Sequence, residues 1–329
     1  MIAIPIKKVK NVISGLNVKL SQHITTIKED LASLLVAPVI DPTKTYNNRQ
    51  LKKNSKDIAH FNIVQSSLDQ IVYVQHLFDN LERIVVAQPQ VLKDFKKEFN
   101  DIIDSDEIEV GFKDVLIEKM GYSNLRSVFY PEYFSGIGIK SCVYCNSQLA
   151  VVSNRSSAHF EVDHNLSKAK YPCFSISLFN LYPICGSCNK RKSKNDIDFK
   201  LYADDADACT VSNFSFEIDK ISLAKYLVNN DIMLLDIKFK EKLNLRFDKT
   251  FKIQGIYNTQ KDLAEELIEK ARIYNDAYKK TLVKSFGRLY TKSALGNRLL
   301  IGNYCEEKEL HNRPMAKFTQ DVAKQLKLI

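Results

Sequence analysis

Cys142-Val143-Tyr144-Cys145 and Cys185-Gly186-Ser187-Cys188 are two cysteine pairs that enclose the segment Glu161-Val162-Asp163-His164. Each Cys-x-x-Cys pair can form a thiolate knuckle, and two knuckles close a tetrahedral Zn²⁺ site that leaves no position for a substrate. The pattern therefore predicts one structural zinc ion, with a redox-active dithiol as the main alternative. The predicted ligands are Cys142, Cys145, Cys185 and Cys188.

Positive charge is concentrated around this cysteine-rich segment. The chain has a formal net charge of +9, and residues 139–200 contain nine Lys or Arg against four Asp or Glu, a local excess of +5. Phosphate contacts supply most non-specific affinity for nucleic acids, so this excess predicts a polyanionic partner. A solvated lysine-rich surface is the alternative.

Composition places the chain among ordinary globular proteins. It has 329 residues, of which 45% are hydrophobic and 26% are charged, and this balance argues against a disordered chain. No apolar run approaches the roughly 18 residues of a membrane span, and no secretory signal is present. We therefore expect a soluble, cytoplasmic protein, in which the three isolated cysteines (Cys173, Cys209 and Cys305) are ordinary thiols.

The first 135 residues show the spacing of helices. Apolar residues recur every three or four positions over 18–35 and 61–85, which predicts one helix in each range. Shorter helices are expected over 92–99 and 115–120, the latter ended by Gly121. The polar stretch 38–57 is predicted to be a loop. Residues 1–135 are therefore expected to form a helical N-terminal region.

The sequence after the cysteine-rich module (136–200) is expected to form strands and then helices. Alternation over 211–218, a β-rich run over 232–239 and alternation over 243–247 predict a small antiparallel sheet. Thr259 and Asp262 have the spacing of a capping box and predict one long helix that continues to Tyr278. A last helix is expected after Pro314. These elements make up a C-terminal region over 201–329.

Polar residues between the two cysteine pairs form a second candidate site. Residues 160–164 are typical of a strand, with Glu161 and Asp163 on one face, so Asp163 and His164 share a site only if the strand bends. After Cys188 a short helix is predicted, on which Asn189 and Lys192 are three residues apart and share a face.

The order Cys-x-x-Cys, Asp-His, Asn, Cys-x-x-Cys-Asn-x-x-Lys resembles the HNH endonucleases, over about 55 of the 329 residues. This resemblance implies an α+β fold in which mainly helical flanks surround a zinc-stabilised, treble-clef-like ββα-metal HNH core. The third motif position is Asn189 here, where the family's name-giving pattern has histidine. The family also contains this variant.

The resemblance implies a role for each motif residue. His164 would be the general base that activates water, and Asp163 and Asn189 would bind a catalytic divalent ion. Asn180 would fix the loop and orient the histidine. Carboxylate and amide oxygens favour Mg²⁺ or Mn²⁺. Lys192 would assist the leaving oxygen, although a phosphate contact or a plain surface lysine are equal alternatives.

Two flanking residues, His159 and Glu161, are candidates for supporting contacts to these groups, with a structural role as the alternative.

The function implied by the resemblance is metal-dependent hydrolysis of DNA phosphodiester bonds. The long flanks are similar to those of nuclease subunits in bacterial anti-phage systems, which implies antiviral defence or restriction with an ATPase or other regulatory partner. Two alternatives remain open at this point. One is a zinc-stabilised nucleic-acid-binding module without catalysis, and the other is an RNA-cleaving toxin.

Overall fold

The computed structural model describes residues 1–39, 41–154, 157–193, 197–242, 246–287 and 293–329. The N-terminal region is helical, as its apolar spacing predicts. Its helices are α1 (Ile6–Gly15), α2 (Asn17–Leu35), α3 (Asn48–Gln65), α4 (Leu68–Val85), α5 (Pro89–Ile102), α6 (Val110–Lys119), α7 (Tyr122–Val128) and α8 (Tyr130–Ile137). The predicted stop at Gly121 is confirmed, because this residue has a φ of 64° between α6 and α7.

Two expectations for this region are wrong. The loop predicted over 38–57 gives way to α3 after Asn47, because Asn47 and Gln50 form a reciprocal capping box with bonds of 2.9 and 3.0 Å. The single helix predicted over 61–85 is interrupted after Gln65. There the Ser66 hydroxyl donates to the Ile63 carbonyl at 2.7 Å, and Ser67 is extended.

The central part of the chain consists of short strands and helices. They are β1 (Ile4–Pro5), β2 (Val151–Asn154), β3 (Ser157–His159), β4 (Glu161–His164), η1 (Pro172–Phe174), η2 (Leu178–Asn180), β5 (Leu181–Ile184), α9 (Gly186–Lys192), β6 (Tyr202–Ala203) and α10 (Ala206–Thr210). β2 pairs antiparallel with β3 and β4 with β5, whereas β1 pairs parallel with β6. The β1–β6 pair joins the start of the chain to the segment after the second cysteine pair.

The C-terminal region contains two strands that are separated by a helix and a 3₁₀ turn, which the sequence did not predict, and further helices follow. Its elements are β7 (Phe214–Ile218), α11 (Lys220–Asn229), η3 (Ile232–Leu234), β8 (Ile237–Glu241), α12 (Phe247–Phe251), α13 (Ile253–Asn258), α14 (Lys261–Ile273), α15 (Asp276–Phe286), α16 (Ser293–Ile301), η4 (Glu307–Asn312) and α17 (Ala316–Gln325). β7 and β8 form an antiparallel pair, and α17 confirms the helix predicted after Pro314.

Local side-chain bonds change three details of the C-terminal prediction. The strand predicted over 232–239 starts only at Ile237, because Asp231 accepts a bond from the Met233 amide at 2.9 Å and sets a 3₁₀ turn. Thr259 ends α13 instead of capping the next helix, and its hydroxyl donates to a backbone carbonyl. The long helix is broken where Asn275 caps α15.

The third predicted strand, over 243–247, lies mostly outside the residues that the structure describes. Its residues 243–245 lie outside the described part of the chain, and Phe247 begins α12.

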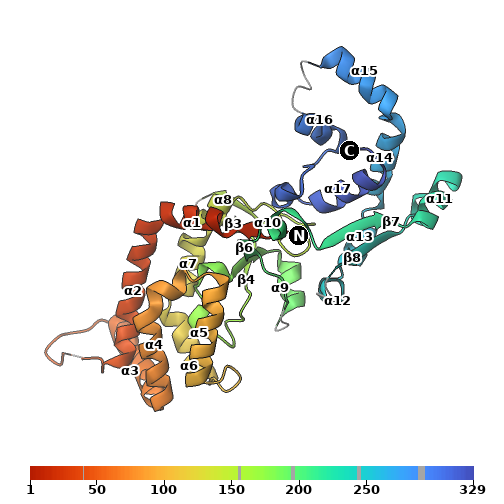
Figure 1. Cartoon of the computed structure of the whole chain (residues 1–329). Helices are drawn as coiled ribbons and strands as arrows, with labels where there is room; N and C mark the ends of the chain where they lie inside the picture. The colour runs from red at the N-terminus through yellow and green to blue at the C-terminus, as the bar shows by residue number, and fades with distance from the viewer. Residues whose placement is uncertain (40, 155–156, 194–196, 243–245, 288–292) are drawn as a thin grey trace.

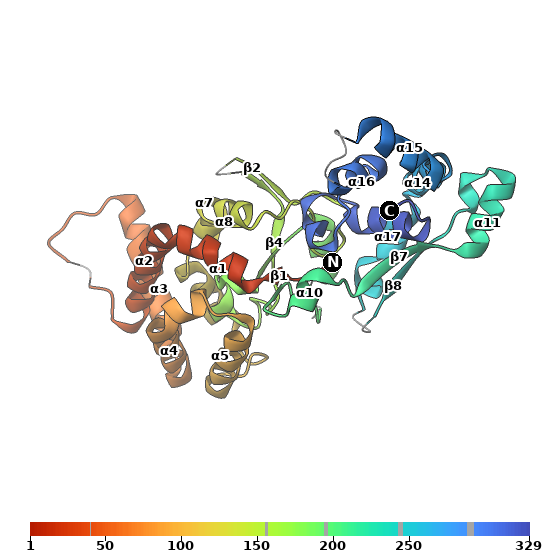
Figure 2. The same cartoon turned by 45° about the horizontal axis from the view of Figure 1, so that its top comes forward.

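One hydrophobic core connects the three parts of the chain. It includes Leu31 of α2, Phe174 of η1 and Phe318 of α17. Figures 1 and 2 show α2 to α6 gathered at one end of the molecule and β7, β8 and α11 to α17 at the other, with β4 and α9 between them. Among the described helices, none combines the length and apolar character of a bilayer-spanning helix.

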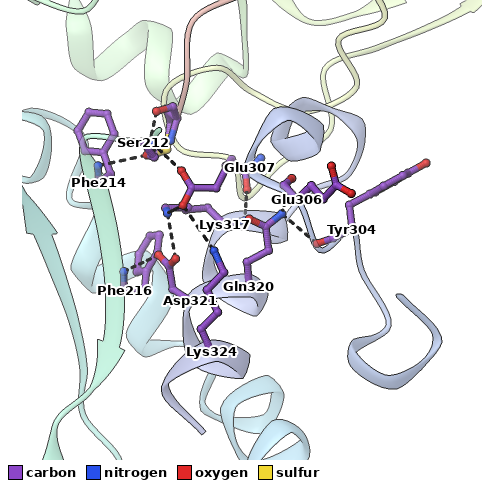
Figure 3. A network of polar contacts seen from close by, with 12 residues as sticks. Ser212, Phe214, Phe216, Tyr304, Glu306, Glu307, Lys317, Gln320, Asp321 and Lys324 are labelled. Atoms are coloured by element: carbon purple, nitrogen blue, oxygen red, sulfur yellow. Dashed lines mark hydrogen bonds and ion pairs between the residues drawn. The ribbon is translucent and has the colours of Figure 1, made fainter. Parts of the chain in front are cut away.

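A buried ion-pair network anchors α17 to β7 (Figure 3). The ammonium of Lys317, a residue only 2% exposed, lies 2.9 Å from Asp321 and 3.2 Å from Glu307. The same two carboxylates accept bonds from backbone amides of Phe216 and Ser212 at 2.9 and 2.6 Å. Because the buried ammonium is compensated by two carboxylates, the network fixes how the C-terminal helix docks.

Candidate functional site

The four paired cysteines form a buried cluster. Their Sγ atoms all lie within 4.8 Å of one another, and Cys145 Sγ is 3.9 Å from Cys185 Sγ. Zn–S bonds of about 2.3 Å place tetrahedral sulfurs roughly 3.8 Å apart, so this spacing fits a zinc ion with little movement. The cluster could therefore hold the structural zinc that the sequence predicts.

Contacts around the cluster connect it to the C-terminal region. Ser147 Oγ donates to Cys145 Sγ at 3.1 Å, and Tyr257 Oη donates to the Cys145 carbonyl at 2.9 Å. Hydrogen bonds from the other three thiols hold the pKa of Cys145 well below its usual value, while burial raises the pKa of Cys142. A thiolate is thus already favoured at Cys145, and a divalent cation would favour it at all four positions.

The segment between the cysteine pairs contains the antiparallel pair of β4 and β5, and α9 begins within the second cysteine pair. In the β4–β5 pair, Asp163 is opposite Tyr182 and His164 is opposite Leu181, and α9 starts directly after Cys185. Asn180 immediately precedes β5 and is 1% exposed. Along the chain, β4 and β5 are separated by η1 and η2, and α9 follows β5.

Asn180 fixes the loop that follows His164. Its Oδ1 accepts a bond from the Leu166 amide at 2.7 Å, and its Nδ2 donates to the Leu166 and Phe174 carbonyls, both at 3.0 Å. The contact of Asn180 is with the loop and not with the histidine ring.

His164 lies at the end of β4 with one ring nitrogen engaged. Its Nε2 is 2.9 Å from the Ser175 carbonyl, so Nε2 carries the hydrogen and Nδ1 is left as an acceptor. The ring packs against Tyr122 at a centroid distance of 5.2 Å. Burial lowers the pKa of His164 to about 3, and the charges of Lys168 and Lys192 act in the same direction. The imidazole is therefore neutral near pH 7.

Asp163 and Lys192 form a buried ion pair. Lys192 Nζ is 3.0 Å from Asp163 Oδ1 and 3.1 Å from the His164 carbonyl, and the Tyr144 hydroxyl donates to Asp163 Oδ2 at 2.6 Å. Lys192 is only 3% exposed. It is thus not a surface lysine, and both oxygens of the predicted metal ligand Asp163 already have a cationic or hydrogen-bonding partner.

Asn189 lies in the same pocket but contacts a different carboxylate. Its Nδ2 donates to Glu161 Oε2, which leaves the carboxamide oxygen free of this bond. A Cβ placed at Gly186 would lie 3.1 Å from Glu161 Oε1, so a glycine at the start of α9 makes room for this side chain. The other flanking residue, His159, instead bonds the Ser153 hydroxyl on β2 at 3.1 Å.

These groups line an open pocket of about 440 Å³. Asp163, His164, Asn189 and Lys192 line it and Asn180 does not, and its lining also includes Tyr122, Arg126, Lys168 and Lys190. Lys168 and Lys190 belong to the basic excess of the sequence, but Tyr122 and Arg126 come from α7, where no motif marks them. Tyr144, which bonds Asp163, is hidden inside the first cysteine pair.

Comparison with known proteins adds no relationship to these observations. No protein-family model, no curated protein and no solved structure matches this chain. A function must therefore be argued from the cysteine cluster and the pocket.

Proposed function

We propose that the protein is a metal-dependent endonuclease of the HNH type that hydrolyses phosphodiester bonds of DNA. One observation carries the proposal. Asp163 and His164 of β4 and Asn189 of α9 line one pocket, beside a four-cysteine cluster. The cysteines would fix the module through zinc, and the pocket would carry the chemistry.

His164 would act as the general base. Because Nε2–H is held by the Ser175 carbonyl, the lone pair of Nδ1 is the one available to take a proton from water. The ring is neutral before the reaction, as a base must be. A phosphodiester in the pocket brings negative charge, which favours the imidazolium that forms.

Asp163 and Asn189 offer oxygen donors of the kind that Mg²⁺ and Mn²⁺ prefer. These two residues would hold the ion, which would supply charge stabilisation for the phosphate and the leaving 3′-oxygen. Lys192 keeps the Asp163 carboxylate in place and adds a positive charge at its Oδ1. Asn180 would act on His164 indirectly, since it fixes the loop that begins directly after His164.

DNA is proposed as the substrate because the chain carries a net charge of +9 and because Arg126, Lys168 and Lys190 face the same pocket. The extensive flanks, which hydrolysis does not require, support a role in antiviral defence or restriction in the cytoplasm. They offer surfaces for a regulatory protein such as an ATPase.

A second candidate is a zinc-stabilised nucleic-acid-binding module without catalysis. It is favoured by one specific observation, namely that Lys192 occupies Asp163 Oδ1 while Asn189 is paired with Glu161. If these pairs persist in the presence of divalent ions, no catalytic metal binds.

Cleavage assays distinguish the two candidates. Purified protein is incubated with supercoiled plasmid or labelled RNA in Mg²⁺ or Mn²⁺, beside His164→Ala and the matched control His159→Ala. We expect plasmid nicking that falls by about 10²-fold or more in His164→Ala, the usual contribution of a general base, and that persists in the control. Equal nicking by both variants would refute the role of His164. Binding without cleavage of either polymer would support the second candidate, and cleavage of RNA alone would replace DNA as the substrate.

A further inference from the structure

Among the described residues that line the pocket, Arg126, Lys168 and Lys190 are cations without a carboxylate partner, and the first two lie next to the histidine side of the site. Arg126 and Lys168 both line the pocket of Asp163 and His164, and neither forms an ion pair with any residue that the structure describes. Lys192, by contrast, is neutralised by Asp163. The basic residues of the pocket therefore differ in whether a carboxylate neutralises them, and only those without such a partner have charge available for a ligand.

Tyr122 lies between Lys168 and the histidine, and Arg126 is on the same helix as Tyr122. Tyr122 and Arg126 are four residues apart on α7, so they lie on one face of that helix. Lys168 Nζ lies over the Tyr122 ring at 4.2 Å from its centroid, and the same ring packs against His164 at 5.2 Å. The cation–π contact holds the ammonium in a defined place without neutralising it.

The arrangement of these charges favours an anion. Burial lowers the pKa of Lys168, and the charge of Arg126 lowers it further, which shows that the two cations act on each other. Lys168 is partly buried and Arg126 is exposed, and neither is neutralised by an ion pair within the described residues, so an anion that contacts both would be stabilised by two positive charges.

A second cavity continues from the pocket. It has a volume of about 230 Å³, shares Arg126 and Val162 with the pocket, and is also lined by Ser127, Ala158 and Phe160. Arg126 thus stands where the two cavities meet. Ser127 belongs to α7 and Ala158 to β3, so the second cavity lies between these two elements.

We propose that Arg126 and Lys168 together bind one phosphate group of a nucleic-acid strand and hold it beside His164. The helical N-terminal region then completes the substrate site through α7, instead of serving only as scaffold. The choice of nucleic acid as the source of the phosphate rests on the proposed function.

The test compares two double variants with the same loss of charge. Arg126→Gln/Lys168→Gln removes the pair, and Arg49→Gln/Lys225→Gln removes an exposed arginine of α3 and an exposed lysine of α11. The Kd for a short fluorescent DNA duplex is measured by anisotropy over a range of KCl concentrations, without added divalent metal. Equal melting temperatures confirm that both variants are folded.

Loss of the pair should weaken DNA binding about tenfold or more, as expected for charge-assisted bonds. It should also reduce the slope of log Kd against log salt by about 0.9, which corresponds to one phosphate contact. The control should change much less. Equal weakening and equal slopes in the two double variants would overturn the proposal, as would failure of the unmodified protein to bind DNA or RNA.

Cleavage of plasmid is then measured for the same proteins. If DNA binding depends on the pair but the unmodified protein cleaves nothing, the phosphate site stands and the proposed hydrolysis fails. If all variants cleave with the same KM, the hydrolysis stands and the phosphate site fails.

Discussion

Replacing Lys192 by methionine should destabilise the protein severely. The side chains of Lys192 and Asp163 are only 4% and 8% exposed, and their charged atoms are 3.0 Å apart. Methionine fills a similar volume but leaves the Asp163 carboxylate with the Tyr144 hydroxyl as its remaining side-chain partner. Removing one partner of a buried pair costs about 3–5 kcal/mol, because the other charge stays buried without compensation. We expect a loss in this range.

The companion variants separate this charge effect from loss of packing. Asp163→Asn alone should also be costly, because the buried Lys192 ammonium loses its only carboxylate partner within the described residues and keeps only neutral oxygen acceptors such as the His164 carbonyl. The double variant Asp163→Asn/Lys192→Met removes both charges and should be more stable than the sum of the two single losses predicts, by about 2–3 kcal/mol. Lys190→Met is the control, since Lys190 is exposed on the same helix; it should stay within about 0.5 kcal/mol of the unmodified protein.

Urea unfolding of zinc-loaded protein, followed by circular dichroism, gives these free energies, and zinc content is measured for each variant. A loss below about 1 kcal/mol for Lys192→Met would contradict the buried pair, given the cost stated above. Strict additivity of the two single variants would contradict the coupling between them.

Three further outcomes are expected. The unmodified protein should contain one zinc per chain by mass spectrometry, and Cys188→Ser should lose both the metal and the fold, because zinc sites supply about 10–16 kcal/mol against a typical stability of about 5–15 kcal/mol. Burial lowers the folded-state pKa of His311 to about 4, below its unfolded value of 6.5. The neutral ring therefore contributes its full share to the free energy of unfolding above pH 6.5, and this share is lost as the pH falls towards 4. Urea unfolding should show about 3 kcal/mol more acid destabilisation for the unmodified protein than for His311→Gln. Gly121→Ala should cost about 1–2 kcal/mol in the same assay, because Gly121 has a φ of 64°, whereas Gly15→Ala, which lacks a positive φ and meets no neighbour, should not destabilise the protein.

Local patterns made much of the fold predictable. Helical spacing identified α2, α5 and α6, because burial of one face repeats along the chain itself, and Pro314 marked the start of α17. The failures were also local in origin. The capping box of Asn47, the turn set by Asp231 and the cap at Asn275 each depend on a side chain that bonds its own backbone neighbours, and apolar spacing does not report such bonds.

The sequence by itself determined the chemistry available to this protein. The spacing within each cysteine pair limits how far apart its thiols can lie, and the structure confirms that both pairs meet in one buried cluster. The roles of His164, Asp163, Asn180 and Asn189 stay predictions, although three of these residues line the same pocket.

Tertiary structure alone decided how those groups are paired and which charges stay available. Lys192 is neutralised because α9 packs across β4 onto Asp163, whereas Lys168 keeps its charge over a tyrosine ring. Arg126 reaches the pocket from a helix that precedes the first cysteine pair. Contacts between residues so distant in sequence depend on how the whole core packs, and for that reason no spacing or motif in the chain could have indicated them.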